Sequence, residues 1–218
     1  AEQATGSARA RLLAAKGELY EEIGDSENAA EAYREALEAD ARDVVVLRAL
    51  RRIAIQKEDW EVAAQLLERE ASLQLTPAER GAAAKLLSHL SAVKLENPAA
   101  AEQAAAQAVT LQPQDFVAWV QLAAARFRRK DDSRAADAIA SAAHCWPEAT
   151  DQVVLLLHAS KQLELRNRPM DAEQLYARAV ELEPSALLAR IALTRLAGGR
   201  IDSEAAALHL EAAAQLAS

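Results

Sequence analysis

The sequence predicts an all-α protein built from about six consecutive helix–turn–helix repeats, or about twelve helices. Only six of its 218 residues are glycine and six are proline, while 51% are hydrophobic, which favours helices joined by short connections. Proline also recurs at a regular interval, because Pro113 and Pro147 lie 34 residues apart and Pro184 follows 37 residues later. An interval of this length is typical of a chain of stacked helical hairpins.

Residues 116–147 form the clearest repeat. On a helical wheel, Trp119 and Leu122 share one broad apolar face, and after a charged break Ala135 and Ile139 lie on a second such face. The proline at the end closes the repeat, since its nitrogen cannot donate a hydrogen bond into a helix. Neither helix can bury its apolar face alone, so each is expected to pack on the other and on neighbouring repeats.

The same pattern extends to both sides of this repeat. Residues 1–9 show no apolar period and are predicted to be a linker or the end of a preceding helix. Three extra residues after Pro147 predict a longer first helix in the repeat that follows. The repeat domain, residues 10–218, divides into units near 10–43, 44–81, 82–115, 116–152, 153–186 and 187–218.

Local signals place turns and helix ends inside this frame. Gly24 and Asp25 predict the turn between the first two helices. Residues 76–79 have the form of a capping box, with proline at the first helical position. The last helix, residues 203–216, is apolar or small on nearly every side, so we expect a further helix, repeat or partner to cover it.

These residues resemble the tetratricopeptide repeat, whose pattern is Trp-x2-Leu-Gly-x2-Tyr, then Ala-x3-Phe, then Pro, on a 34-residue period. In that pattern the small residue lets two helices touch, and the aromatic residue fills the space between repeats. The resemblance covers nearly the whole chain and implies a right-handed α-solenoid with an extended concave surface. The matching residues are Gly17, Tyr20, Ala29, Tyr33 and Ala36 in the first repeat, Trp119, Leu122, Ala135 and Pro147 in the fourth, and Ala172, Tyr176, Ala179 and Pro184 in the fifth.

In this family the first helix of each pair builds most of the concave wall. The resemblance therefore implies a wall with an apolar middle and several lining cations, which suits an acidic, amphipathic peptide or helix. The predicted partner-binding residues are Arg48, Arg52, Leu86, Leu90, Val93, Lys94, Val117, Val120, Phe127, Arg128, Leu157 and Lys161. Further wall positions are held by Val154, Leu188 and Ile191.

Composition and motifs argue against several other functions. The formal net charge of -8 and the pI near 5.1 do not suit a nucleic-acid partner. The four histidines lack metal-ligand spacing, and the single cysteine, Cys145, takes a position held by leucine in other repeats, so it is predicted to be a core thiol. No phosphate loop or catalytic constellation is present, so we expect no enzyme activity, metal or cofactor. No apolar run is long enough for direct membrane insertion.

The sequence thus predicts a non-catalytic scaffold that binds a peptide or helix of a partner protein in its concave groove. Two alternatives stay open. The chain could be a self-association module whose last helix forms a homo-oligomer, or a targeting module of a larger multi-domain protein. A soluble protein of the cytoplasm or the periplasm fits either case, and the sequence does not choose between these compartments.

Overall fold

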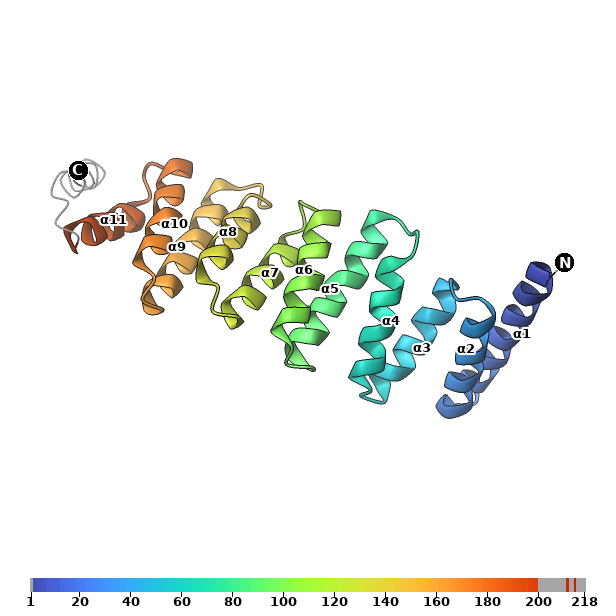
Figure 1. Ribbon diagram of the computed structural model, residues 1–218. Helices are drawn as coiled ribbons and strands as arrows, with labels where there is room; N and C mark the ends of the chain where they lie inside the picture. The colour runs from blue at the N-terminus through green and yellow to red at the C-terminus, as the bar shows by residue number, and fades with distance from the viewer. Residues whose placement is uncertain (1, 200–210, 212–213, 215–218) are drawn as a thin grey trace. The chain divides into compact units, whose positions relative to one another are not determined.

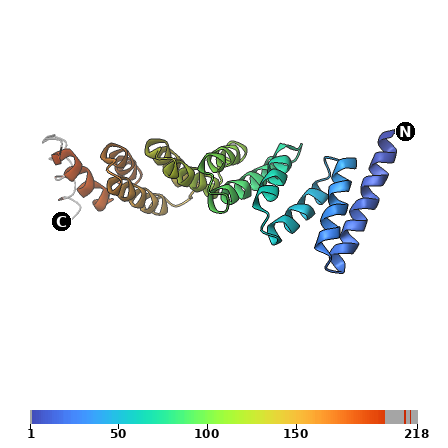
Figure 2. The same ribbon diagram turned by 60° about the horizontal axis from the view of Figure 1, so that its bottom comes forward.

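The computed structural model of the protein describes residues 2–199, 211 and 214, and Figure 1 labels its helices in chain order. The chain divides into two compact units. Unit 1 spans Ala1–Asn97 and unit 2 spans Pro98–Ser218. Unit 1 contains α1 (Glu2–Glu22), α2 (Ser26–Ala39), α3 (Val44–Gln56), α4 (Trp60–Ser72) and α5 (Pro77–Val93). Consecutive helices of this unit run antiparallel and lie side by side, as the turned view also shows (Figure 2).

Unit 2 repeats this arrangement of antiparallel helices. It contains α6 (Pro98–Leu111), α7 (Phe116–Arg128), α8 (Asp132–Ala143), α9 (Ala149–Leu165), α10 (Pro169–Leu182) and α11 (Leu187–Gly199). The part of the chain that the structure describes is all-helical, which confirms the predicted fold class. Apart from residues 211 and 214, the predicted last helix, residues 203–216, lies outside the described residues, and so does the homo-oligomer contact assigned to it.

Most helices begin at an acidic or hydroxyl side chain that caps their free backbone N–H groups. Asp25, Asp43 and Asp115 each accept hydrogen bonds from backbone N–H groups of the first helical turn. Before α5, Thr76 and Glu79 cap each other's backbone, with proline at the first helical position, so the predicted capping box is confirmed. Short polar loops can therefore end one helix and begin the next without leaving donors unpaired.

Five of the short loops between helices each contain one residue in the left-handed region of backbone space. Gly24 has φ 78°, and the later hairpins place Glu58, Glu96, Lys130 and Asn167 there with φ between 49° and 62°. This conformation ends the first helix of the hairpin, because the next backbone N–H then bonds back to a carbonyl in its last turn. Only the first hairpin has the residue type for which this conformation costs nothing.

Close packing of small and large residues fills the core of each unit. In unit 1, Tyr33, Leu47 and Ile53 are 1–2% exposed. Gly17 of α1 lies against the Tyr33 ring so tightly that an added Cβ would overlap it. In unit 2, Leu156 and Leu163 of α9 are fully buried. The predicted role of the small residue, which is to let two helices touch, thus holds in the first hairpin.

Three helices start earlier than the repeat boundaries predicted from the sequence. α1 begins at Glu2 rather than near residue 10, so residues of the predicted linker continue the helix. α5 begins at Pro77 rather than near residue 82, because the capping box starts the helix there. α9 begins at Ala149 rather than near residue 153, and the three inserted residues extend the helix to 17 residues.

Candidate functional site

In unit 1, two of the predicted wall cations, Arg48 and Arg52, are held by carboxylates of the same chain. Arg48 donates from Nε to Oε1 of Glu70 at 2.6 Å and from Nη2 to Oε1 of Glu79 at 3.3 Å. The hydrogen bond to Glu70 and its negative charge raise the pKa of Arg48 above its ordinary value. Arg48 and its two carboxylate partners line a cavity of about 230 Å³, and Leu86 borders it too. A partner that binds here meets an arginine that already has two anionic neighbours.

Arg52 belongs to a second network, which joins three helices of unit 1. Its Nη2 donates to both oxygens of Glu21, at 2.8 and 2.7 Å, and the hydroxyl of Tyr33 donates to the same carboxylate at 2.8 Å. Burial alone would raise the pKa of Glu21, but the hydrogen bonds from Arg52 and Tyr33 outweigh it and leave that pKa lowered. Burial and the bond to Glu21 raise the pKa of Tyr33.

Unit 2 contains the same triad at the same sequence spacing. The hydroxyl of Tyr176 donates to Oε1 of Glu164 at 2.7 Å, and Arg195 donates to the other oxygen of that carboxylate. In both units the tyrosine follows the glutamate by 12 residues and the arginine follows it by 31. These triads were not predicted from the sequence, although the repeated Glu–Tyr–Arg spacing would have revealed them.

The last helix of unit 1 requires one correction to the predicted site. Leu90 is only 4% exposed, so its side chain belongs to the core and not to the wall. α5 turns this position inward together with Leu87, because the helix is one continuous run from its proline cap. Val93 is 48% exposed, and the amine of Lys94 lies 4.5 Å from the centre of the Trp60 ring in a cation–π contact.

In unit 2, three successive first helices expose aliphatic side chains in pairs. α7 exposes Val117 and Val120, at 52% and 38%. Further along the chain, Val154 of α9 is 60% exposed, with Leu157 half-buried beside it. α11 exposes the third pair, Leu188 and Ile191, at 68% and 51%. We call these six residues the aliphatic row.

Two cavities lie beside the aliphatic row. The first, with a volume of about 190 Å³, is lined by Val120, Ala123, Ala124, Phe127, Ile139, Ala142, Leu155, His158, Ala159 and Gln162. We call it the α7–α9 pocket. The second, of about 320 Å³, lies between α9 and α11 and is lined by Leu157, Lys161, Tyr176, Leu188, Ile191, Ala192 and Arg195.

The remaining predicted cations of unit 2 lie at the ends of these helices. Arg128 is exposed at the end of α7. Lys161 lies 3.9 Å from Glu164, and its side chain is 56% exposed. The guanidinium of Arg166 stacks on the Phe127 ring at 4.3 Å from its centre and also lies 3.4 Å from Asp132.

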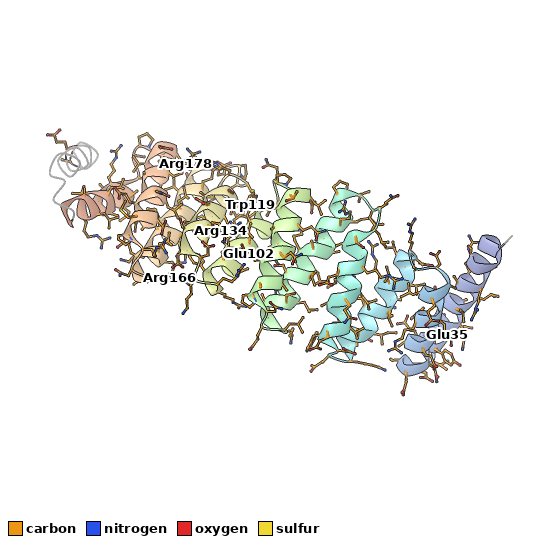
Figure 3. The ribbon with its side chains drawn as sticks, viewed as in Figure 1. Glu35, Glu102, Trp119, Arg134, Arg166 and Arg178 are labelled. Carbon is orange, nitrogen blue, oxygen red and sulfur yellow. The ribbon has the colours of Figure 1, made fainter. Side chains whose placement is uncertain are left out.

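A separate charged cluster braces the start of unit 2. Glu102 of α6 is only 8% exposed and accepts hydrogen bonds from Arg126 and Arg129 at the end of α7. Arg134 of α8 lies 4.0 Å away from the same carboxylate, and Figure 3 shows the two side chains near each other. Burial would raise the pKa of Glu102, but its arginine partners lower it overall. This cluster joins three helices and faces no cavity described above.

Two side chains that could take part in binding or catalysis, those of Trp119 and Cys145, hydrogen-bond to backbone carbonyls of the same chain. The indole N–H of Trp119 donates to the carbonyl of Pro113 at 2.8 Å. Cys145 is half-buried rather than fully buried as predicted, and its thiol donates to the carbonyl of Ser141 at 3.6 Å. Burial and the nearby carboxylate of Asp115 raise the pKa of this thiol, which disfavours the nucleophilic thiolate.

Two kinds of feature are absent from the part of the chain that the structure describes. Within residues 2–199 and at positions 211 and 214, no group of three or more His, Cys, Asp or Glu side chains is arranged to hold a metal ion. Over the same residues, no helix has the length and apolarity needed to cross a membrane.

The first hairpin supplies the deciding comparison. Residues 10–43, which hold α2 and most of α1, match the family model of the tetratricopeptide repeat. This hairpin is a tetratricopeptide repeat. A search of curated proteins gave no match.

Several solved structures share the fold of most of the chain. The structure of YrrB, a TPR protein with an unusual peptide-binding site, is 20% identical, covers 81% of this chain and 88% of its own, and has a TM-score of 0.52. A MamA structure is 19% identical, with coverages of 81% and 93% and a TM-score of 0.55. Naa15/Naa10 bound to HypK-THB is 15% identical, with coverages of 94% and 31% and a TM-score of 0.62.

The tetratricopeptide fold is in general a scaffold for protein–protein interaction, and its members are typically non-catalytic modules. Stacked hairpins present a long wall of first helices, on which residues from several repeats can meet one ligand. In this chain the first helices of unit 2 carry the aliphatic row and line most of both cavities beside it.

Proposed function

We propose that this tetratricopeptide protein is a non-catalytic scaffold that binds a peptide or helix of a partner protein on the wall of its first helices. The aliphatic row of unit 2 is the main contact in this proposal, and the wall of unit 1 adds polar contacts. The proposed contact residues are Arg48, Arg52, Leu86, Val93, Lys94, Val117, Val120, Phe127, Arg128, Val154, Leu157, Lys161, Leu188 and Ile191.

The aliphatic row is the observation that carries the proposal. Five of its six side chains are 38–68% exposed, which leaves apolar surface in contact with water on three consecutive first helices. Covering such surface gains about 25 cal/mol per Å². An amphipathic segment with apolar residues on one face would cover the row.

The charges beside the row favour an acidic partner. Lys161 and Arg195 share Glu164, yet each side chain is 56% exposed and has N–H donors to offer. Arg128 adds a third exposed cation at the end of α7. A carboxylate placed near these groups gains attraction and orients the bound segment, while a like-charged segment is repelled.

One structural neighbour supports the same mode of binding. YrrB, which shares the fold, is a TPR protein with an unusual peptide-binding site. We extend peptide binding to this chain as part of the proposal, on the strength of the exposed row rather than of the shared fold.

Two synthetic helical peptides of about 15 residues test the proposal. Both carry the same apolar stripe with one phenylalanine at its centre, and they differ only in having glutamate or lysine beside it. We expect the acidic peptide to bind more tightly in fluorescence anisotropy. Val117→Glu together with Val154→Glu should weaken its binding about tenfold or more, because the variant puts carboxylates into the contact.

Met170→Glu is the matched control, since Met170 is 59% exposed at the start of α10, a second helix. It should bind the acidic peptide as the unchanged protein does. Equal binding by the double variant and the unchanged protein would remove the row from the proposed function. Equal binding of the acidic and basic peptides would remove the acidic partner.

A further inference from the structure

The α7–α9 pocket differs from the other cavities described above in being lined almost entirely by apolar side chains. Eight of its ten lining residues are apolar, and the other two are His158 and Gln162. All ten lie on three helices of unit 2. An apolar hole edged by a small number of polar groups has the composition of a binding pocket.

The residues of α9 that line this pocket have buried counterparts in other repeats. Val46 and Ile53 of α3 precede the turn residue Glu58 by the same numbers of residues as Leu155 and Gln162 precede Asn167. On α3 both residues are 2% exposed and pack in the core, whereas on α9 the first is half-buried and the second exposed.

Two further first helices keep these positions packed. Ala118 and Ala125 hold the same two positions on α7 and are 0% and 2% exposed, so α7 is packed as closely as α3. On α5, which also follows inserted residues, Ala84 and Ser91 hold them and are 0% and 1% exposed, so an insertion by itself does not open the pocket. A gap between packed helices costs free energy unless something fills it.

We propose that the α7–α9 pocket holds one side chain of the size of phenylalanine or leucine, supplied by an acidic peptide segment of the partner. The inference rests on the proposed function and names the residue that the ligand must contain. The volume fits, because a cavity of about 150 Å³ with aliphatic and aromatic walls suffices to bind benzene. The pocket, at about 190 Å³, takes one ring or one branched chain and no more.

The rim of the pocket fixes what lies next to this anchor. His158 and Gln162 are exposed on one side of α9 and can hydrogen-bond the main chain of a bound segment. Arg166, whose guanidinium stacks on the pocket residue Phe127, has a side chain that is 44% exposed. An acidic residue within a turn of the anchor would meet this cation, which makes an anchor flanked by acids the matching ligand.

The test compares the acidic peptide described above with a version in which alanine replaces its phenylalanine. On the unchanged protein we expect this replacement to weaken binding about tenfold or more, since it empties the pocket. Ala124→Phe should fill the pocket from an exposed position on α7 and should bind both peptides equally weakly. Ala99→Phe, at an exposed position of α6 away from the pocket, should behave as the unchanged protein.

A second probe separates the pocket from the peptide. N-acetylphenylalanine amide, titrated into ¹⁵N-labelled protein, should shift amide signals of α7–α9 in the unchanged protein and not in Ala124→Phe. If the phenylalanine peptide and its alanine version bind the unchanged protein equally tightly, the pocket proposal fails while the proposed function stands. If neither peptide binds but the amide shifts those signals, the pocket takes a small apolar group, but the peptide anchor and the proposed function both fail. If neither probe binds, both fail.

Discussion

Gly17 sets the distance between α1 and α2. A Cβ at this position would overlap the Tyr33 ring, which cannot move freely because it is 2% exposed and bonded to Glu21. Gly17→Ala should therefore lower the free energy of unfolding by about 1–3 kcal/mol, the usual cost of overpacking a core. Urea denaturation, monitored by circular dichroism, measures this change in the free energy of unfolding.

Gly198→Ala is the matched control, because a Cβ at Gly198 would meet no atom within 4 Å. This change should leave the stability equal or raise it by up to about 1 kcal/mol, as alanine does in a helix. A Gly17→Ala protein as stable as the unchanged one would contradict the close packing of α1 on α2.

The left-handed turn residues make a second prediction at single positions. Glu58 and Lys130 hold φ values of 57° and 62°, which strain a side chain other than that of glycine or asparagine. Glu58→Gly or Lys130→Gly should raise the free energy of unfolding by up to about 1 kcal/mol and therefore raise the midpoint of thermal unfolding. Lys57→Gly, where φ is -87°, should lower it instead. A fall in the midpoint for both turn variants would contradict the strain.

At the scale of helices, the two Glu–Tyr–Arg triads tie neighbouring first helices together through a carboxylate. The pKa values of Glu21 and Glu164 are lowered below their ordinary 4.5 in the folded protein. A lowered pKa means that the stabilisation is complete above the unfolded value and is lost as the pH falls through the folded value. Stability should thus fall as the pH drops below about 4.5.

Glu21→Gln with Glu164→Gln should reduce this pH dependence, because glutamine does not titrate. Denaturant unfolding at pH 7 and pH 3 measures the difference in unfolding free energy for each protein. Glu22→Gln, which changes an exposed neighbour outside the triad, serves as control and should keep the dependence of the unchanged protein. The same pH dependence in the double variant would show that the triads do not contribute.

The helices were predictable from the sequence because local signals specify them. The apolar faces of α7 and α8, the turn at Gly24 and the capping box at Thr76 are all encoded within a few residues. The insertion after Pro147 was predicted to lengthen the next first helix, and α9 does have 17 residues, although the repeat boundary was placed near residue 153 and the helix begins at Ala149.

The wall was only partly predictable. Spacing along a helix gives the face on which a residue lies, but not how far the neighbouring helix covers that face. Leu90 was predicted to be a partner-binding residue and is buried. Val154 and Leu188 were predicted only as further wall positions, and both are exposed. Nor could spacing show that Arg48 and Arg52 are held by carboxylates, because those partners lie 22 to 31 residues away.

At the scale of the whole chain, a solenoid transmits a local loss of stability mainly to adjoining repeats. Leu47→Ala and Leu156→Ala each empty a fully buried site, one per unit, and should cost about 2–5 kcal/mol locally. By hydrogen exchange, the first variant should lose protection mostly in α2–α4 and the second mostly in α8–α10. A uniform loss across all helices in either variant would indicate a single cooperative fold instead.

The left-handed turn residues also show where the chain tolerates a change of length. Successive turns are 34, 38, 34 and 37 residues apart, from Gly24 to Asn167. The extra residues lie before α5 and α9, in the joints between hairpins, and the one-residue turn inside each hairpin is kept. An engineer who wishes to graft a reporter peptide into this protein should therefore splice it into a joint and leave every turn intact.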